Sequence, residues 1–420
     1  ADGQRVSLKG PKGIDDLGGL VENGGESSLN SQFYGNMHNM GHVIIAYAHD
    51  PEKRHNENIG PMGDEATAMK DPVFYRWHKF IDDLFDKYKQ TLGAYPEPEL
   101  LWPGVRVSEI SVSTSGRDKN LLVTNWMQSD IDLTRGLDLQ RSSAMNQGPV
   151  WARVTHLNHE SFTYNITVEN NAGPGARATV RIFLAPRFNE HGQRFPYSHQ
   201  RTIFFEMDKF TVLLQKGTNQ ITRDSKDSSV TIPWESSFRD LEKLMEGGEY
   251  KSQDAICGCG WPQHLLLPMG NAGGVIFDLF VMLTDGAKDA VPRKNPERPN
   301  CKESLSYCGS LDELYPDTKP MGFPFDKIGR SITKPGTNMA AVVQNLDEFI
   351  PKNSNMATVQ VKIIHEDRVS LRGNGAPATV AVITPSRATS KTSTTKTTAS
   401  LNNPAPAQTQ YRGRSRPNRV

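Results

Sequence analysis

The sequence contains no apolar run of 18 residues and only four cysteines among its 420 residues. A bilayer-spanning helix needs roughly 20 consecutive apolar residues, so a transmembrane helix is excluded. The chain begins with Ala1 rather than Met, and its first residues show no signal-peptide pattern of charged, apolar and small residues. At roughly 100–200 residues per domain, the length suggests two to four domains.

The chain also has almost no net charge, because its 48 Lys and Arg residues nearly balance its 47 Asp and Glu residues. The distribution is uneven, since residues 386–420 contain seven basic residues and no acid, which leaves the rest with a charge of −6. A mildly acidic body has no electrostatic attraction for phosphates, so no nucleic-acid partner is expected. The tail 386–420 has 12 Ser or Thr in 35 residues and few apolar positions, and it is expected to be disordered.

The four cysteines stand close together in the sequence, as C-x-C at Cys257 and Cys259 and as C-x6-C at Cys301 and Cys308. A single intervening residue rarely lets both sulfurs turn to one metal, which disfavours a zinc site. Two disulfides are the better interpretation, and they indicate an oxidising compartment.

The first hundred residues have a helical pattern. Residues 36–47 predict one helix, and Asp71-Pro72 predicts the start of another, since Asp caps helices and Pro suits their first position. Apolar residues then recur every three or four positions up to Tyr88, which is typical of one buried helix face. Pro96 and Pro98 end the pattern.

From about residue 104 the period of the pattern changes to two. The strands that it predicts are 105–112, 162–168, 178–184, 202–214, 275–283 and 359–363, and one helical insert is expected at 234–245. Short alternating strands separated by turns are typical of an antiparallel β-sandwich. The expected fold class is therefore α+β, with a helical bundle followed by a sandwich.

Three of the eleven histidines stand out by their context. His38 and His42 lie four residues apart on one helix face, and His78 lies on the apolar face of a separate helix. Two helices of a bundle can present three imidazoles to one copper, zinc or iron ion, with an open position for catalysis. Spacing alone leaves a second interpretation open, because such histidines also occur as ordinary packed or surface residues.

The segments around these histidines resemble the second copper half-site, copper B, of arthropod prophenoloxidases and hemocyanins. The resemblance covers about residues 30–370 and rests on seven motifs: HNMGH (38–42), MGDEATAM (62–69), DPVFYRWH (71–78), LWPGV (101–105), CGCGWP (257–262), FVMLTD (280–285) and MGFPFD (321–326).

The resemblance implies that His38, His42 and His78 bind copper B, and that three further histidines bind a second copper. No histidine precedes His38, so the chain is expected to be a carboxy-terminal fragment that lacks the second set of ligands and is inactive alone. It also implies three domains: the carboxy-terminal half of the helical copper domain (1–103), an immunoglobulin-like sandwich (104–385) and the tail (386–420).

The activity that the resemblance implies for the complete protein is that of a phenoloxidase. Such an enzyme uses O2 to hydroxylate monophenols at the ortho position and to oxidise o-diphenols to o-quinones, for melanin synthesis and innate immunity. The family further implies a secreted hemolymph zymogen, an activating serine protease and a homo- or hetero-oligomer, with no membrane partner. The alternative is a hemocyanin-type oxygen carrier. A copper-free storage protein of the hexamerin type is disfavoured because all three histidines are present.

The resemblance also suggests roles for individual residues. Glu65, 13 residues before His78, matches an acid proposed to take the phenol proton, and Asn39 matches an Asn that helps to hold a water molecule. The family implies that Cys257 pairs with Cys301 and Cys259 with Cys308. Because residues 258–262 also resemble the thioester site of complement proteins, a thioester at Cys259 is the alternative to these disulfides. The glycosylation sequon at Asn165 is expected to be unmodified.

Overall fold

The computed structural model describes residues 8–9, 13–22, 31–132, 151–232, 260–291, 316–333 and 340–371. All of them belong to one compact unit, Ala1–Val382. The expected helical insert at 234–245, the tail 386–420 and all four cysteines lie outside the described residues. None of the described helices combines the length and the apolar character that crossing a membrane requires.

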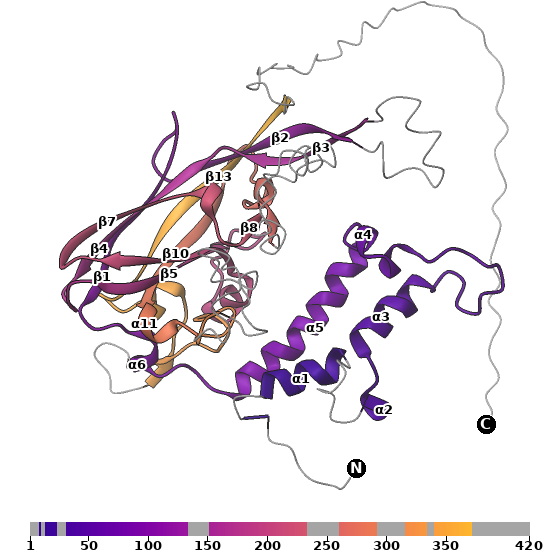
Figure 1. The fold of residues 1–420 in the computed structure, drawn as a ribbon, viewed down its shortest axis with the longest axis horizontal. Coiled ribbons are helices and arrows are strands. Elements are labelled where there is room, and N and C mark those ends of the chain that lie inside the picture. The colour runs from indigo at the N-terminus through magenta and orange to yellow at the C-terminus, as the bar shows by residue number, and fades with distance from the viewer. Residues whose placement is uncertain are drawn as a thin grey trace, which may run out of the picture. The chain divides into compact units, whose positions relative to one another are not determined.

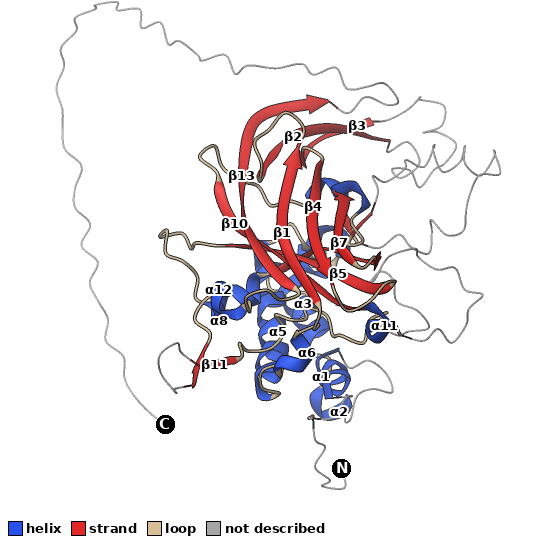
Figure 2. Ribbon diagram, turned by 90° about the vertical axis from the view of Figure 1, so that its left-hand side faces the viewer, coloured by secondary structure: helices blue, strands red, loops and turns tan. Residues whose placement is uncertain are grey.

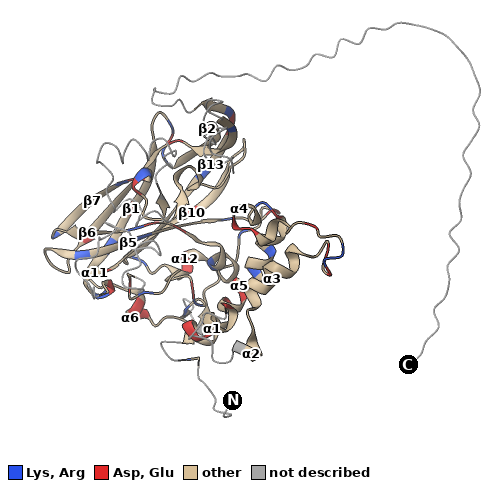
Figure 3. Cartoon of the chain, turned by 45° about the vertical axis from the view of Figure 1, so that its right-hand side comes forward, with Lys and Arg blue, Asp and Glu red and all other residues tan. Residues whose placement is uncertain are grey.

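The amino-terminal part is helical, as predicted (Figure 1). Asp71 accepts a hydrogen bond from the Val73 amide and Pro72 is the first helical residue, so the predicted start of the long helix is confirmed. Acidic residues also occupy the first turns of α1 and α6, where the helix dipole favours them (Figure 3). The helices are α1 (Gly13–Glu22), α2 (Ser31–Tyr34), α3 (Met37–Ala46), the 3-10 turn η2 (Pro61–Gly63), α4 (Glu65–Ala68), α5 (Pro72–Thr91) and α6 (Glu97–Leu100).

The rest of the described chain is built on two sheets, which lie face to face (Figure 2). The smaller has the order β1-β4-β7, with strands Val105–Thr114, Phe162–Asn170 and Gly217–Asp224. The larger has the order β3-β2-β13-β10-β5-β6, with strands Trp151–His159, Leu121–Asp132, Met356–Leu371, Val275–Asp285, Ala176–Pro186 and Phe205–Leu214. The predicted α+β class is thereby confirmed.

Short elements complete the described fold. They are β8 (Thr231–Ile232), β9 (Trp261–Pro262), β11 (Ser331–Thr333), β12 (Ala340–Val342), α8 (Tyr197–Gln200), η3 (Arg201–Ile203), η4 (Ser225–Asp227), η5 (Gln263–Leu265), α11 (Gly286–Asp289) and α12 (Leu346–Phe349). The strand predicted at 202–214 begins only at Phe205, because residues 201–203 form η3 instead.

The large sheet is mixed rather than purely antiparallel. Strand β13 pairs antiparallel with β10 but parallel with β2, with Ile363 opposite Leu122. The register between β13 and β2 shifts between His365 and Val369, and this irregularity accompanies the strong curvature of β13 in Figure 2.

The centre of the large sheet is buried on both faces. Eight consecutive residues of β5 and of β10 are buried, unlike the alternation expected of a strand with one wet face. One face packs against the small sheet through residues such as Val180, Ile166 and Leu279. The other face, including Phe183 and Phe280, packs with a second apolar cluster: Tyr95, Leu100, Tyr197, Phe323, Phe325, Val343, Leu346 and Phe349.

Buried polar contacts tie the end of α5 to this second cluster. The Lys89 ammonium lies 2.7 Å from the Asp326 carboxylate, which also accepts a hydrogen bond from the Tyr95 hydroxyl at 3.0 Å. Nearby, Arg201 donates to Asp86 at 2.8 Å. Because these pairs are largely removed from water, they hold α5, and with it His78, in a fixed relation to the sheet.

Candidate metal centre

Helices α3 and α5 meet closely at a glycine. A Cβ atom at Gly41 would collide with the indole ring of Trp77, so only glycine lets the ring lie against α3. The indole Nε1 of Trp77 donates to the carbonyl of His38 at 3.2 Å. This crossing fixes the distance between the helix that bears His38 and His42 and the helix that bears His78.

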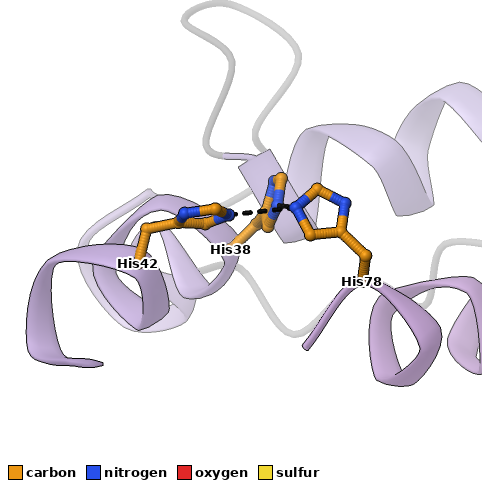
Figure 4. A group of neighbouring side chains, drawn as sticks. All are labelled: His38, His42 and His78. Carbon is orange, nitrogen blue, oxygen red and sulfur yellow. Dashed lines mark hydrogen bonds between the residues drawn. The ribbon is translucent and has the colours of Figure 1, made fainter. Parts of the chain in front are cut away.

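The three predicted histidines converge at this crossing (Figure 4). His78 Nε2 lies 3.4 Å from His38 Nε2 and 3.1 Å from His42 Nε2. One ring nitrogen from each residue lies within 4.8 Å of the others, and within the described residues this is the one group of at least three His, Cys, Asp or Glu with such a geometry. All three side chains are half-buried.

The opposite ring nitrogens of two of these histidines contact acceptors. His42 Nδ1 lies 2.9 Å from the carbonyl oxygen of Met62, and His38 Nδ1 lies 2.5 Å from Oε1 of Glu22. Because a carbonyl or a carboxylate can only accept, each Nδ1 carries a proton, and in the neutral ring Nε2 then has a free lone pair. Two lone pairs thus point at the third imidazole, an arrangement that favours a cation between them.

The third imidazole lies in a more apolar setting. The ring of Phe74 stacks on His78 with centroids 3.9 Å apart, one helical turn earlier on α5. Burial lowers the pKa of His78, and the nearby His38 and His42 lower it further, while Glu22 opposes them. A lowered pKa keeps this imidazole neutral, which is the form that binds a metal.

The loop between α3 and η2 positions the Met62 carbonyl. The buried carboxylate of Asp50 accepts hydrogen bonds from the backbone amides of Arg54, His55 and Glu57. This one side chain therefore fixes the conformation of the loop. The Gly60 amide then donates to the Ala46 carbonyl at 2.9 Å. The Met62 side chain is 2% exposed, so its burial anchors this turn. The backbone carbonyl of Met62 then orients the ring of His42.

The three nitrogens fit a copper ion chemically, and the two separations measured from His78 fit it by spacing. Imidazole binds copper, zinc, iron and nickel, and a ligand set without carboxylates or thiolates suits copper in either oxidation state. A metal bound at about 2.0 Å separates two of its nitrogen ligands by about 3.3–3.5 Å. The observed separations from His78 Nε2, 3.4 and 3.1 Å, lie close to this range.

The structure does not bring Glu65 and Asn39 to the three imidazoles. Glu65 is the first residue of α4, and Asn39 follows His38 on α3; both side chains are exposed. The described residues show no side-chain hydrogen bond from either to the histidines. The backbone N–H of Asn39 donates to the side-chain oxygen of Asn36, which caps α3. The roles of both residues stay predictions, as do the two disulfides.

Two partners of the site were not found from the sequence. Glu22 lies 16 residues before His38, in a segment without any motif, and the contribution of Met62 is a backbone carbonyl. The amphipathic pattern of residues 13–22 could have placed a helix there. It could not have paired that helix with α3.

Comparison with protein families matches two domains to this chain. The copper-containing domain of hemocyanin matches residues 1–85, and the ig-like domain of hemocyanin matches residues 94–365. Phenoloxidase 1 of Holotrichia diomphalia is 46% identical over 368 residues, which are 87% of this chain and 51% of that protein. Phenoloxidase 3 of Drosophila melanogaster is 44% identical over 365 residues, 87% of this chain and 50% of the relative.

Solved structures give the same picture. A scorpion hemocyanin in its activated state has a TM-score of 0.74 and 38% identity, covering 87% of this chain and 54% of that one. A hemolymph-type prophenoloxidase from a crustacean has a TM-score of 0.68 and 30% identity, covering 86% of this chain and 50% of the other. The chain spans about half the length of the curated relatives that it matches.

Proposed function

Because this chain belongs to the hemocyanin family of copper proteins, we propose that His38, His42 and His78 bind one copper ion of a phenoloxidase centre. The observation that carries the proposal is the convergence of three Nε2 atoms, two of which are freed by acceptors at Nδ1. Bound copper supplies the electron transfer with O2 that the protein side chains lack.

The activity needs a second copper, whose ligands would come from an opposing helical segment. Several large hydrophobic side chains of the helical part remain at least 40% exposed: Phe33, Tyr34, Met40, Val43, Ile44, Ile59, Met69, Tyr75 and Phe80. We propose that some of these side chains pack against helices that carry the ligands of the second copper.

The proposed reaction is the O2-dependent ortho-hydroxylation of monophenols and the oxidation of o-diphenols to o-quinones. In this proposal Phe74, stacked on His78, keeps water from one side of the centre. A phenol has a pKa near 10, so its proton needs an acceptor before the oxygen can bind a metal. The Glu65 carboxylate is proposed to accept that proton and Asn39 to hold a bridging water, once the opposing segment encloses both.

The surroundings of the complete protein are also proposals. The phenoloxidase relatives and the hemolymph-type prophenoloxidase support a secreted hemolymph protein that acts on phenolic molecules and assembles into oligomers. Activation by a serine protease follows from the family resemblance alone. The division of the chain at residues 103 and 385 follows from the change of pattern near residue 104 and from the composition of residues 386–420.

An oxygen carrier is the second candidate function. The specific observation in its favour is the scorpion hemocyanin structure, which has a higher identity and a higher TM-score than the prophenoloxidase structure. Enzyme and carrier share the three copper ligands, so the imidazoles themselves do not distinguish the two functions.

Replacing Glu65 by glutamine tests the enzymatic proposal, in a polypeptide that completes the centre with a second metal site. We expect monophenol hydroxylation to fall by about 100-fold, the lower end of the contribution of a general base, while o-diphenol oxidation changes by less than about threefold. Glu57→Gln, an exposed acid on the same stretch of chain, is the matched control. Equal losses of both activities would refute the base role. Reversible O2 binding without oxidation of either substrate would favour the carrier.

A further inference from the structure

Glu22 is the one carboxylate within the described residues that is bonded to one of the three histidines. It is the last residue of α1, and its Oε1 lies 2.5 Å from His38 Nδ1. The His38 side chain is 17% exposed and the Glu22 side chain 45%. The contact joins α1 to α3 through two residues that are 16 positions apart in the sequence.

The position of Glu22 runs against the local preference of a helix. The carbonyl groups at a helix end repel a carboxylate, and the last turn of α1 contains no basic residue that would compensate. The first turn follows the usual preference, with Asp15 and Asp16. A residue that breaks a local rule and has one specific partner is typical of a functional position.

The fold holds the end of α1 next to α3. Val21, the residue before Glu22, is 3% exposed, and Gly19 is buried as well. Before the helix begins, the Tyr88 hydroxyl of α5 donates to the Leu8 carbonyl at 2.7 Å. The hydrogen bond at Leu8 holds the chain before α1, and the burial of Val21 holds the end of α1. Packing therefore places Glu22 against His38.

We propose that Glu22 is a positioning residue for the metal centre. Its carboxylate keeps the proton of His38 on Nδ1, orients the ring, and makes Nε2 a stronger electron donor than Nε2 of His42, whose Nδ1 meets only a neutral carbonyl. The two imidazoles of α3 are therefore unequal ligands. This inference rests on the proposed function, because it assumes that the three histidines bind copper.

The first test needs no copper. In the metal-free protein, NMR of nitrogen-labelled histidine distinguishes the Nδ1–H from the Nε2–H form of each ring. We expect His38 to be in the Nδ1–H form in the wild type and in Glu22→Gln, whose amide oxygen can still accept. We expect Glu22→Ala to shift His38 toward the Nε2–H form while His42 stays unchanged. A His38 tautomer that is the same in all three proteins would overturn the proposal.

The second test measures the dissociation constant for Cu(I) by competition with a chelator of known affinity. Removal of such a partner typically weakens metal binding by about 10–100-fold, so we expect that loss for Glu22→Ala and a smaller loss for Glu22→Gln. Asp16→Asn, an acid-to-amide change on the same helix, is the matched control and should stay within about twofold of the wild type. Equal affinities of wild type and Glu22→Ala, or an equal loss in Asp16→Asn, would overturn the inference.

The two proposals fail in different ways. If the three histidines do not bind copper, the wild type itself shows no high-affinity site, while the tautomer measurement still reports on the contact between Glu22 and His38. If only the role of Glu22 is wrong, the wild type binds copper and both Glu22 variants bind it equally well.

Discussion

Replacing His78 with alanine is expected to weaken copper binding by at least about 1,000-fold, equivalent to about 4 kcal/mol. His78 is the residue to which the other two nitrogens are closest, at 3.4 and 3.1 Å, and it alone comes from α5. Without it, His38 and His42 remain as a pair on one helix, which cannot enclose a metal from two sides. The measurement is competition for Cu(I) with a chelator of known affinity.

His191→Ala is the control for this experiment. The His191 side chain is 72% exposed and lies in the sheet region, outside the three-histidine group. We expect its copper affinity to equal that of the wild type. The same affinity in His78→Ala and His191→Ala would show that copper binds somewhere other than at the crossing of α3 and α5.

The largest effect on stability is expected from Arg181→Ala, at about 3–5 kcal/mol. The Arg181 side chain is 2% exposed. Its guanidinium donates to both carboxylate oxygens of Asp317, at 2.6 and 3.2 Å, and lies 3.2 Å from one carboxylate oxygen of Asp289. Removal of the guanidinium leaves two carboxylates buried. Lys209, whose ammonium lies 3.3 Å from Asp317, then remains as a nearby cation. We expect a melting temperature lower by about 10 °C, measured by circular dichroism.

Arg153→Ala provides a matched comparison. Arg153 also pairs with a carboxylate, that of Asp130 at 2.7 Å, but its side chain is 60% exposed. An exposed ion pair contributes about 0–1 kcal/mol, so this variant should melt within about 3 °C of the wild type. If Arg181→Ala and Arg153→Ala melted at the same temperature, burial would not determine the strength of these ion pairs.

The helical part of the fold was largely predictable because its signals are local. Asp71-Pro72 defines the start of α5 through one side-chain hydrogen bond and one fixed backbone angle. The seven-residue step between Phe74 and Ile81 defines the buried face of the same helix. The close approach at Gly41 was not predicted, because it depends on where the Trp77 ring lies in three dimensions.

The candidate site also contains residues that could be predicted from local sequence and residues that could not. His38, His42 and His78 could be named from spacing and from the resemblance of the motifs around them, and the structure brings them together. Glu22 could not be named, since its partner lies on another helix and neither residue carries a shared motif. Glu65 was named through the resemblance alone, and its role as a base stays a prediction.

The sheet was predicted less completely, for two physical reasons. Strand β3 has mostly exposed or half-buried residues on both faces and therefore gives no alternation, so it was missed. Strands β5 and β10 are buried on both faces, so their apolar runs do not indicate which neighbours they pair with. The parallel pairing of β13 with β2 depends on contacts about 240 residues apart, which no local pattern encodes.

The proposed copper site consists of the three converging histidines of this chain. Its most direct test is the ratio of copper to protein after copper loading and dialysis, measured by atomic absorption on the 420-residue chain and on a variant with His38, His42 and His78 all changed to alanine. We expect one copper per wild-type chain and none in the triple variant. An unchanged ratio in the triple variant would show that copper does not bind through these histidines.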